Sequence, residues 1–139
     1  MDPKIYWVGF SLVKGIGAVR FRALLQYFGD MECAWSASLS DLMKAGLSQK
    51  LAEGVLHARS TIRLQEKFDQ LQQLGIAVLT WDDPTYPRYL KEISQPPPVL
   101  YMRGSIKPED DVAVAVVGTR RITGYGRQVA EELGGYLAR

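Results

Sequence analysis

Apolar side chains recur with a helical period in three stretches of the first half of the chain. Residues 4–13 and 18–28 each place apolar positions three and four residues apart. Residues 61–74 carry the same spacing and are followed by Gly75, a residue type that favours the position just after a helix. Because this spacing gathers apolar side chains on one face, all three stretches are predicted to be amphipathic helices.

The first two predicted helices are separated by the short segment Lys14-Gly15-Ile16-Gly17. The order helix, Gly-hydrophobic-Gly, helix is the helix-hairpin-helix pattern. Glycine lets the backbone turn tightly, and the start of the second helix then exposes N–H groups that a DNA phosphate can approach. Gly15, Ile16 and Gly17 are therefore a possible DNA-binding hairpin. The alternative is that the motif serves only in packing or protein contact.

The hairpin pattern occurs a second time. One constant offset superposes Gly15 on Gly46 and Ile16 on Leu47, and it also aligns apolar positions of the helices that follow. In the second copy Ser48 replaces the last glycine, and serine is a favourable helix N-cap, so we expect this copy to be structural. Two such hairpins joined by a linker helix predict a small all-α, SAM-like domain over residues 1–59.

Strand patterns begin after Gly75. Residues 76–80 and 99–103 are short apolar runs flanked by turn residues and prolines, so both are predicted strands. Residues 112–117 are a third apolar run, predicted as a buried strand, and a glycine-containing loop and a helical pattern over 127–139 follow it. The order of buried strand, loop and helix is typical of the first βα unit of a Rossmann-like domain.

The predicted fold class is α+β overall, with the helical domain followed by the beginning of an α/β Rossmann-like domain over residues 60–139. A parallel strand needs neighbouring strands and crossover connections, and the pattern over 112–139 leaves no room for them. We therefore expect the α/β domain to be incomplete and the chain to be the N-terminal part of a longer protein.

The composition is that of a soluble globular protein, with 47% hydrophobic and 23% charged residues. The apolar runs are too short for a transmembrane helix and the N-terminus lacks the features of a signal peptide, which favours a cytoplasmic protein. The single cysteine, Cys33, excludes an internal disulfide and is expected to be a small buried residue. His57, the single histidine, stands in no catalytic or metal-binding constellation, so no catalytic residue, metal site or cofactor is predicted.

The net charge of +2 is too small to indicate a nucleic-acid partner by itself. The local distribution is more informative, because the segment between Asp111 and Glu131 holds Arg120, Arg121 and Arg127 but no acidic residue. The glycine-containing loop is therefore cationic, and the helix that follows adds unpaired N–H groups and a positive dipole end. Its sequence, GTRRITGYG, does not match the dinucleotide-binding fingerprint.

Several motifs together resemble the DNA-processing protein A (DprA/Smf) family. They are the helix-hairpin-helix region, LTWDDPTYPRYL, PPPVLYMRG and VAVVGTRRITGYGRQVAEEL, and they extend over nearly the whole chain. The resemblance implies a non-enzymatic protein of natural transformation that binds single-stranded DNA on an extended Rossmann domain. Such a protein protects incoming DNA and loads a RecA-type recombinase. The resemblance also implies a homodimer, formed only in the intact chain, and no membrane partner.

The resemblance places the DNA-binding residues in the cationic loop and in the first turn of its helix. In the family this loop lines the DNA pocket, and the residue that corresponds to Arg120 meets a phosphate. The candidate DNA-binding residues are Gly118, Thr119, Arg120, Arg121, Tyr125, Gly126 and Arg127. Two other interpretations stay open: a Rossmann-like nucleotide-processing enzyme of the lysine-decarboxylase-like type, and a helical protein-interaction module.

Overall fold

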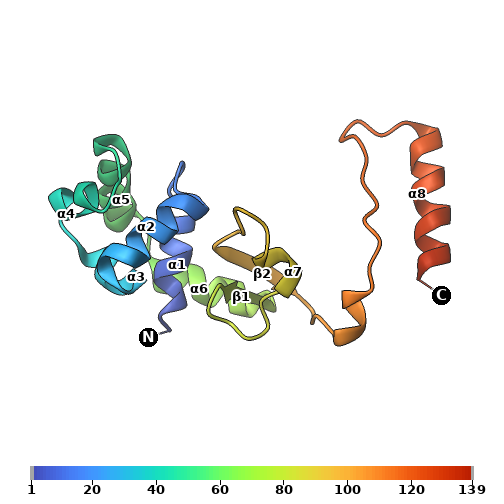
Figure 1. Ribbon diagram of the computed structural model, residues 1–139, viewed down its shortest axis with the longest axis horizontal. Helices are drawn as coiled ribbons and strands as arrows, with labels where there is room; N and C mark the ends of the chain where they lie inside the picture. The colour runs from blue at the N-terminus through green and yellow to red at the C-terminus, as the bar shows by residue number, and fades with distance from the viewer. Residues whose placement is uncertain (1, 139) are drawn as a thin grey trace. The chain divides into compact units, whose positions relative to one another are not determined.

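The computed structural model describes residues 2–138, without the side chains of residues 110 and 111. The chain divides after Ile106 into two compact units, each of which is described by itself. The first unit is mostly helical and carries one small sheet, whereas the second has a 3₁₀ turn, an extended segment and a helix (Figure 1). The predicted α+β class is confirmed at this level.

The first unit follows the predicted order of helices and strands. Its elements are α1 (Lys4–Ser11), α2 (Ala18–Phe28), α3 (Met31–Ser36), α4 (Leu39–Lys44), α5 (Gln49–Thr61), α6 (Leu64–Gln73), β1 (Ile76–Thr80), α7 (Arg88–Lys91) and β2 (Val99–Arg103). The boundaries of α2 and of both strands agree with the prediction. The helix predicted over 61–74 begins only at Leu64, because α5 extends through Thr61.

The two hairpin copies share their backbone geometry. Gly15 and Gly46 have φ angles of +95° and +98°, in the left-handed region that residues with a Cβ rarely adopt. Ile16 and Leu47, which follow them, are both buried. The two turns thus share a left-handed glycine followed by a buried apolar residue, whereas the repeat of a whole helix-hairpin-helix motif stays a prediction.

We expect Gly46→Ala to lower the free energy of unfolding by about 1–2 kcal/mol, because the left-handed conformation is costly for any residue with a Cβ. No heavy atom lies within 4 Å of the position that the new Cβ takes, so the cost is conformational rather than steric. Gly54→Ala is the matched control: Gly54 lies inside α5, where alanine is expected to be neutral or stabilising. Denaturant unfolding measures both variants, and an unchanged stability of Gly46→Ala would contradict the prediction.

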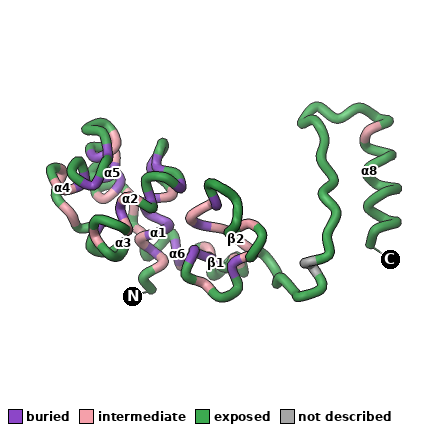
Figure 2. The backbone as a smooth tube through the Cα atoms, viewed as in Figure 1, coloured by how far each residue is buried: buried purple, intermediate pink, exposed green. Residues whose placement is uncertain are grey.

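An aromatic cluster forms the centre of the first unit. Trp7 of α1 stacks on Phe21 of α2 with 5.5 Å between ring centroids, and Phe10 meets Trp35 of α3 edge to face at 5.0 Å. Trp81, which follows β1, contacts Trp7 edge to face at 5.7 Å. All three tryptophans are buried, so they hold α1, α2, α3 and the turn after β1 in one core. Figure 2 shows the buried residues of the first unit in purple.

The sheet of the first unit consists of β1 and β2 in antiparallel pairing, with Ile76 opposite Arg103. It packs against α1 and α6. Lys4 of α1 ties the turn after β1 to the helices, because its Nζ lies 2.6 Å from a carboxylate oxygen of Asp83 and donates to the Val78 carbonyl at 3.1 Å. The division predicted between a helical and an α/β domain stays a prediction.

The second unit contains η1 (Pro108–Asp111), an extended segment and α8 (Gly124–Leu137). The prediction of a buried strand over 112–117 is wrong: these residues pair with no described strand, and Val112 and Val117 are 93% and 91% exposed. The apolar run has the composition of a strand, but a parallel strand forms only where neighbours supply hydrogen bonds and cover both faces. Figure 2 shows the whole segment as exposed.

The start of α8 also differs from the prediction, which placed it at residue 127. Oγ1 of Thr123 accepts a hydrogen bond from the N–H of Gly126 at 3.1 Å and so caps the helix. Because a threonine N-cap stabilises the first turn, the helix begins at Gly124. It therefore includes Gly124 and Gly126, which the sequence pattern assigned to the loop.

The expectation of a buried cysteine is also wrong, because Cys33 is exposed. Its backbone N–H donates to the Asp30 carboxylate that caps α3, and the hydrogen bond between the thiol and Asp30 raises the pKa of Cys33. No helix among residues 2–138 has the length and apolar composition to cross a lipid bilayer.

Candidate nucleic-acid interface

The cationic loop of the second unit is shaped by two threonines. Oγ1 of Thr119 accepts a hydrogen bond from the N–H of Arg121 at 3.3 Å, and Thr123 caps α8. The N–H of Arg127 then continues the helix by donating to the Thr123 carbonyl at 3.0 Å. Since all these bonds are local in sequence, the residues of the loop themselves determine its conformation.

A cavity of about 600 Å³ lies between this loop, the extended segment and α8. The structure gathers four of the seven candidate residues around the cavity and leaves the three arginines outside its lining. The candidates that line it are Gly118, Thr119, Tyr125 and Gly126. The sequence prediction missed Thr123, Val129 and Leu133, which also line the cavity. Val129 and Leu133 are four residues apart and so lie on one face of α8. This spacing could have indicated that both line the cavity.

Two arginines of the loop and one in the first turn of α8 are free to meet an anion. Arg120, Arg121 and Arg127 are exposed, and among the side chains that the structure describes none forms an ion pair with them. Guanidinium groups bind phosphate oxygens with two parallel hydrogen bonds, and the N–H groups at the start of α8 add a partial positive charge. The loop therefore has the donors and the charge for a phosphate backbone.

Gly126 holds its place in the first turn of α8 for a steric reason. A Cβ built on it meets Oγ1 of Thr123 at 3.3 Å and Cγ1 of Ile122 at 3.4 Å. The first distance is tighter than an ordinary contact, so the threonine cap and the close turn both depend on glycine at this position.

The first hairpin belongs to the first unit and presents a second possible contact surface. Gly15 and Gly17 are exposed, whereas Ile16 is buried and anchors the turn rather than facing a ligand. No side chain caps α2, so the N–H groups of Ala18 and Val19 remain open, whereas that of Arg20 donates to the Gly17 carbonyl at 3.0 Å. Lys14 and Arg20 beside the turn are exposed.

Arg22 differs from those two cations, because the fold already uses it. Its guanidinium donates to the Ser94 carbonyl at 3.1 Å and lies 5.5 Å from the ring centroid of Trp81. This residue therefore connects α2 to the segment after α7.

The second hairpin is closed by its own serine. Oγ of Ser48 accepts a hydrogen bond from the N–H of Leu51 at 3.4 Å and caps α5. The hydroxyl satisfies one N–H of the first turn of α5, which agrees with the structural role predicted for this copy. His57 lies further along α5 and is exposed.

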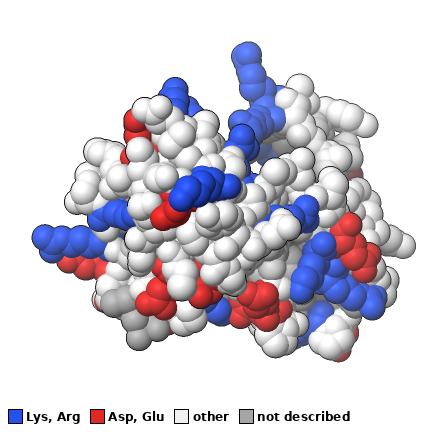
Figure 3. All heavy atoms as spheres, turned by 60° about the vertical axis from the view of Figure 1, so that its left-hand side comes forward, with Lys and Arg blue, Asp and Glu red and all other residues white. Residues whose placement is uncertain are grey.

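Charges of both signs lie together on the surface that Figure 3 shows. On the face shown in Figure 3, Lys and Arg side chains are interspersed with Asp and Glu side chains. This agrees with the net charge of +2 and means that any anion site depends on local clusters.

The chain is similar to a protein family and to two curated proteins. Residues 77–139 match the model of a family described as DNA recombination-mediator protein A. The chain is 36% identical over 130 residues to Protein Smf of Synechocystis sp., which covers 90% of this chain and 33% of that protein. It is 41% identical over 46 residues to UvrABC system protein C of Aster yellows witches'-broom phytoplasma, 33% of this chain and 8% of that protein. No solved structure gives a significant match. The chain spans about a third of the length of Protein Smf.

Proposed function

Because the chain belongs to the DNA recombination-mediator protein A (DprA/Smf) family, we propose that it binds single-stranded DNA and delivers it to a RecA-type recombinase. The protein protects incoming DNA during natural transformation and acts as a mediator rather than as an enzyme. As a homodimer of the intact protein it presents the DNA to the recombinase.

One observation carries the proposal of DNA binding. The family match covers residues 77–139, and these include exposed Arg120 and Arg121 before α8 and exposed Arg127 in its first turn, none of which pairs with a described carboxylate. Such a loop contacts the sugar-phosphate backbone, so we expect binding that depends on salt and selects weakly for sequence. Arg120 is the residue that we propose to meet a phosphate.

The fold assignments follow the same proposal. Residues 1–59 form a SAM-like domain with two helix-hairpin-helix motifs, of which the first has an uncapped helix that suits a DNA phosphate. Residues 60–139 begin a Rossmann-like domain.

We expect Arg120→Ala to weaken binding of single-stranded DNA about ten-fold in the protein as the cell makes it, because one charge-assisted phosphate contact is lost. Fluorescence anisotropy of a labelled oligothymidine measures the affinity. Arg63→Ala is the matched control, because Arg63 is an exposed arginine that pairs with Glu66 at 2.9 Å in the first unit. Equal losses for Arg120→Ala and Arg63→Ala would remove the loop from the DNA site.

A further inference from the structure

Two neighbouring cavities of the first unit share a wall residue. The first, of about 630 Å³, lies between the first hairpin and α5, and the second, of about 360 Å³, lies between α1, α6 and the sheet. Both volumes are in the usual range of binding pockets. Leu12, which directly follows α1, lines both cavities, so they adjoin there and are together called the Leu12 groove.

The half of the Leu12 groove beside the hairpin is cationic. Lys14 of the hairpin and Lys50 and His57 of α5 line it, and no carboxylate does so among the described residues. Neither lysine takes part in an ion pair with a described side chain. Lys50 and His57 are seven residues apart and so lie on the same face of α5, two turns from each other. This half therefore offers two ammonium groups and an imidazole to a ligand.

The other half of the Leu12 groove exposes large apolar side chains. Leu12, Leu74 and Tyr101 are 49%, 62% and 48% exposed, and all three line this half. The Tyr101 hydroxyl shares a hydrogen bond with Oγ of Ser11 at 3.0 Å, which holds the ring beside the end of α1. Because neighbouring large apolar side chains that stay exposed mark interaction sites, this patch indicates a surface that a partner covers.

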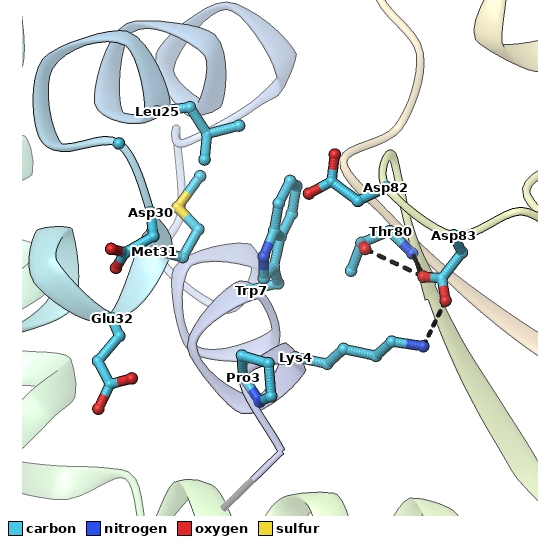
Figure 4. A pocket seen from close by; sticks show the side chains of 11 residues that line it. Pro3, Lys4, Trp7, Leu25, Asp30, Met31, Glu32, Thr80, Asp82 and Asp83 are labelled. Atoms are coloured by element: carbon cyan, nitrogen blue, oxygen red, sulfur yellow. Dashed lines mark hydrogen bonds and ion pairs between the residues drawn. The ribbon is translucent and has the colours of Figure 1, made fainter.

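The start of α1 lies at a cavity of the opposite charge. Four carboxylates line that cavity, and its one lysine, Lys4, is paired with Asp83 (Figure 4). The other three carboxylates belong to Asp30, Glu32 and Asp82. An acidic ligand is repelled there, so of these cavities the Leu12 groove is the one that suits carboxylates.

We propose that the Leu12 groove binds an acidic segment of a partner protein, in which carboxylates adjoin a large aliphatic side chain. The carboxylates meet Lys14 and Lys50, and the aliphatic side chain covers Leu12, Leu74 and Tyr101. Such a segment matches the charge of one half of the groove and removes the exposed apolar area of the other half from water.

A nucleic-acid strand fits the Leu12 groove less well. Every nucleotide carries a phosphate, so a strand requires cations along its whole path. Among the described residues that line the apolar half, Lys67 is the one cation, and its Nζ already donates to Gln70 at 3.3 Å. The separation of the cations from the apolar patch therefore favours a peptide, and the proposal does not depend on DNA binding by the cationic loop.

The test is a fluorescence anisotropy titration of labelled acetyl-Asp-Glu-Asp-Gly-Leu-Leu-amide with the protein as the cell makes it. We expect saturable binding that weakens when the two leucines are replaced by serine and disappears when the three acidic residues are replaced by lysine. Lys50→Ala is expected to lower the affinity about two- to five-fold, the effect of one exposed charge partner. Leu74→Ala is expected to lower it about three- to ten-fold, because less apolar area is buried.

Each variant has a matched control elsewhere in the first unit. Lys44→Ala removes an exposed lysine of α4 that pairs with Asp41 at 2.9 Å. Val19→Ala removes apolar surface from a residue of α2 that is 56% exposed. Neither Lys44 nor Val19 lines the Leu12 groove, so both controls are expected to keep the affinity of the native protein.

Several outcomes would overturn the proposal. They are the absence of saturable binding, equal binding of the serine or lysine peptide, and an unchanged affinity of Lys50→Ala or of Leu74→Ala. If these two variants weakened binding of oligothymidine but not of the peptide, the groove would be a nucleic-acid site instead. Self-association of the protein that Leu74→Ala abolishes and the peptide does not compete with would assign the groove to a second copy of the chain.

Discussion

Phe21→Ala is expected to lower the free energy of unfolding of the first unit by about 3–5 kcal/mol, the cost of emptying a large aromatic site in a close-packed core. Phe21 has no exposed surface, and its ring contacts Trp7, Phe10 and Trp81 with centroids 5.5, 6.0 and 6.2 Å away. No single neighbour can move into the space, because each also packs against another element. Such a loss is a large fraction of the stability of an ordinary domain.

Denaturant unfolding followed by tryptophan fluorescence measures this loss directly, because Trp7, Trp35 and Trp81 all lie in the first unit. Val19→Ala is the matched control: Val19 is on the same helix but 56% exposed, so its loss is expected to change stability by less than about 0.5 kcal/mol. A loss for Phe21→Ala no larger than that of Val19→Ala would contradict the aromatic core.

Asp83→Ala is expected to cost about 2–3 kcal/mol, because it leaves several polar groups without their partner. The Asp83 carboxylate binds Lys4 Nζ and also accepts from the backbone N–H and the hydroxyl of Thr80, a residue only 3% exposed. Lys4 keeps only its bond to the Val78 carbonyl in the variant. Asp82→Ala, next in the chain but exposed, is expected to leave stability within about 0.5 kcal/mol of the native value.

The contribution of Asp83 also depends on pH in a definite direction. Burial raises the pKa of Asp83, but the hydrogen bonds from Lys4 and Thr80 and the charge of Lys4 outweigh it, so the pKa is below its usual value. A depressed pKa in the folded state stabilises the fold above the unfolded pKa of about 3.9. This stability is lost as the pH falls through the folded pKa. The stability difference between native protein and Asp83→Ala should therefore shrink below about pH 4, and a constant difference would contradict the ionised pair.

Elements bounded by glycine were predictable to the residue. α2 lies between Gly17 and Gly29, β1 begins after Gly75, and β2 ends before Gly104. All of these glycines except Gly17 have a positive φ. Glycine marks these boundaries because the conformation excludes other residues. The predicted linker helix corresponds to α3 alone, and α4 was not predicted, because its start depends on the local cap of Ser38.

The apolar run over 112–117 was not predictable in the same way. Its valines have the composition of a buried strand, but a strand also requires partners, and no other described segment pairs with it. The composition of a segment indicates whether its side chains favour burial in a sheet. Whether they are buried depends on the neighbouring segments that cover them. The same distinction explains Cys33, whose residue type favours the interior although its place after the Asp30 cap is at the surface.

The sequence named the candidate DNA-binding residues, which stay a prediction, but it did not predict how they are arranged. The loop, its three arginines and the helix that follows were all predicted, and the helix start depends on Thr123, a cap that was overlooked. The sequence pattern also did not indicate that the three arginines lie outside the lining of the cavity, whereas Gly118, Thr119, Tyr125 and Gly126 belong to it. That separation follows from the local hydrogen bonds of Thr119 and Thr123.

The salt dependence of binding tests the central proposal most directly. In the protein as the cell makes it, the logarithm of the association constant for oligothymidine is plotted against the logarithm of the salt concentration, for the native protein and for Arg120→Ala. If Arg120 neutralises one phosphate, the slope of the variant is shallower by about 0.7, and its affinity is lower at every salt concentration. Identical slopes and affinities for the two proteins would contradict the assignment of the cationic loop to the DNA backbone.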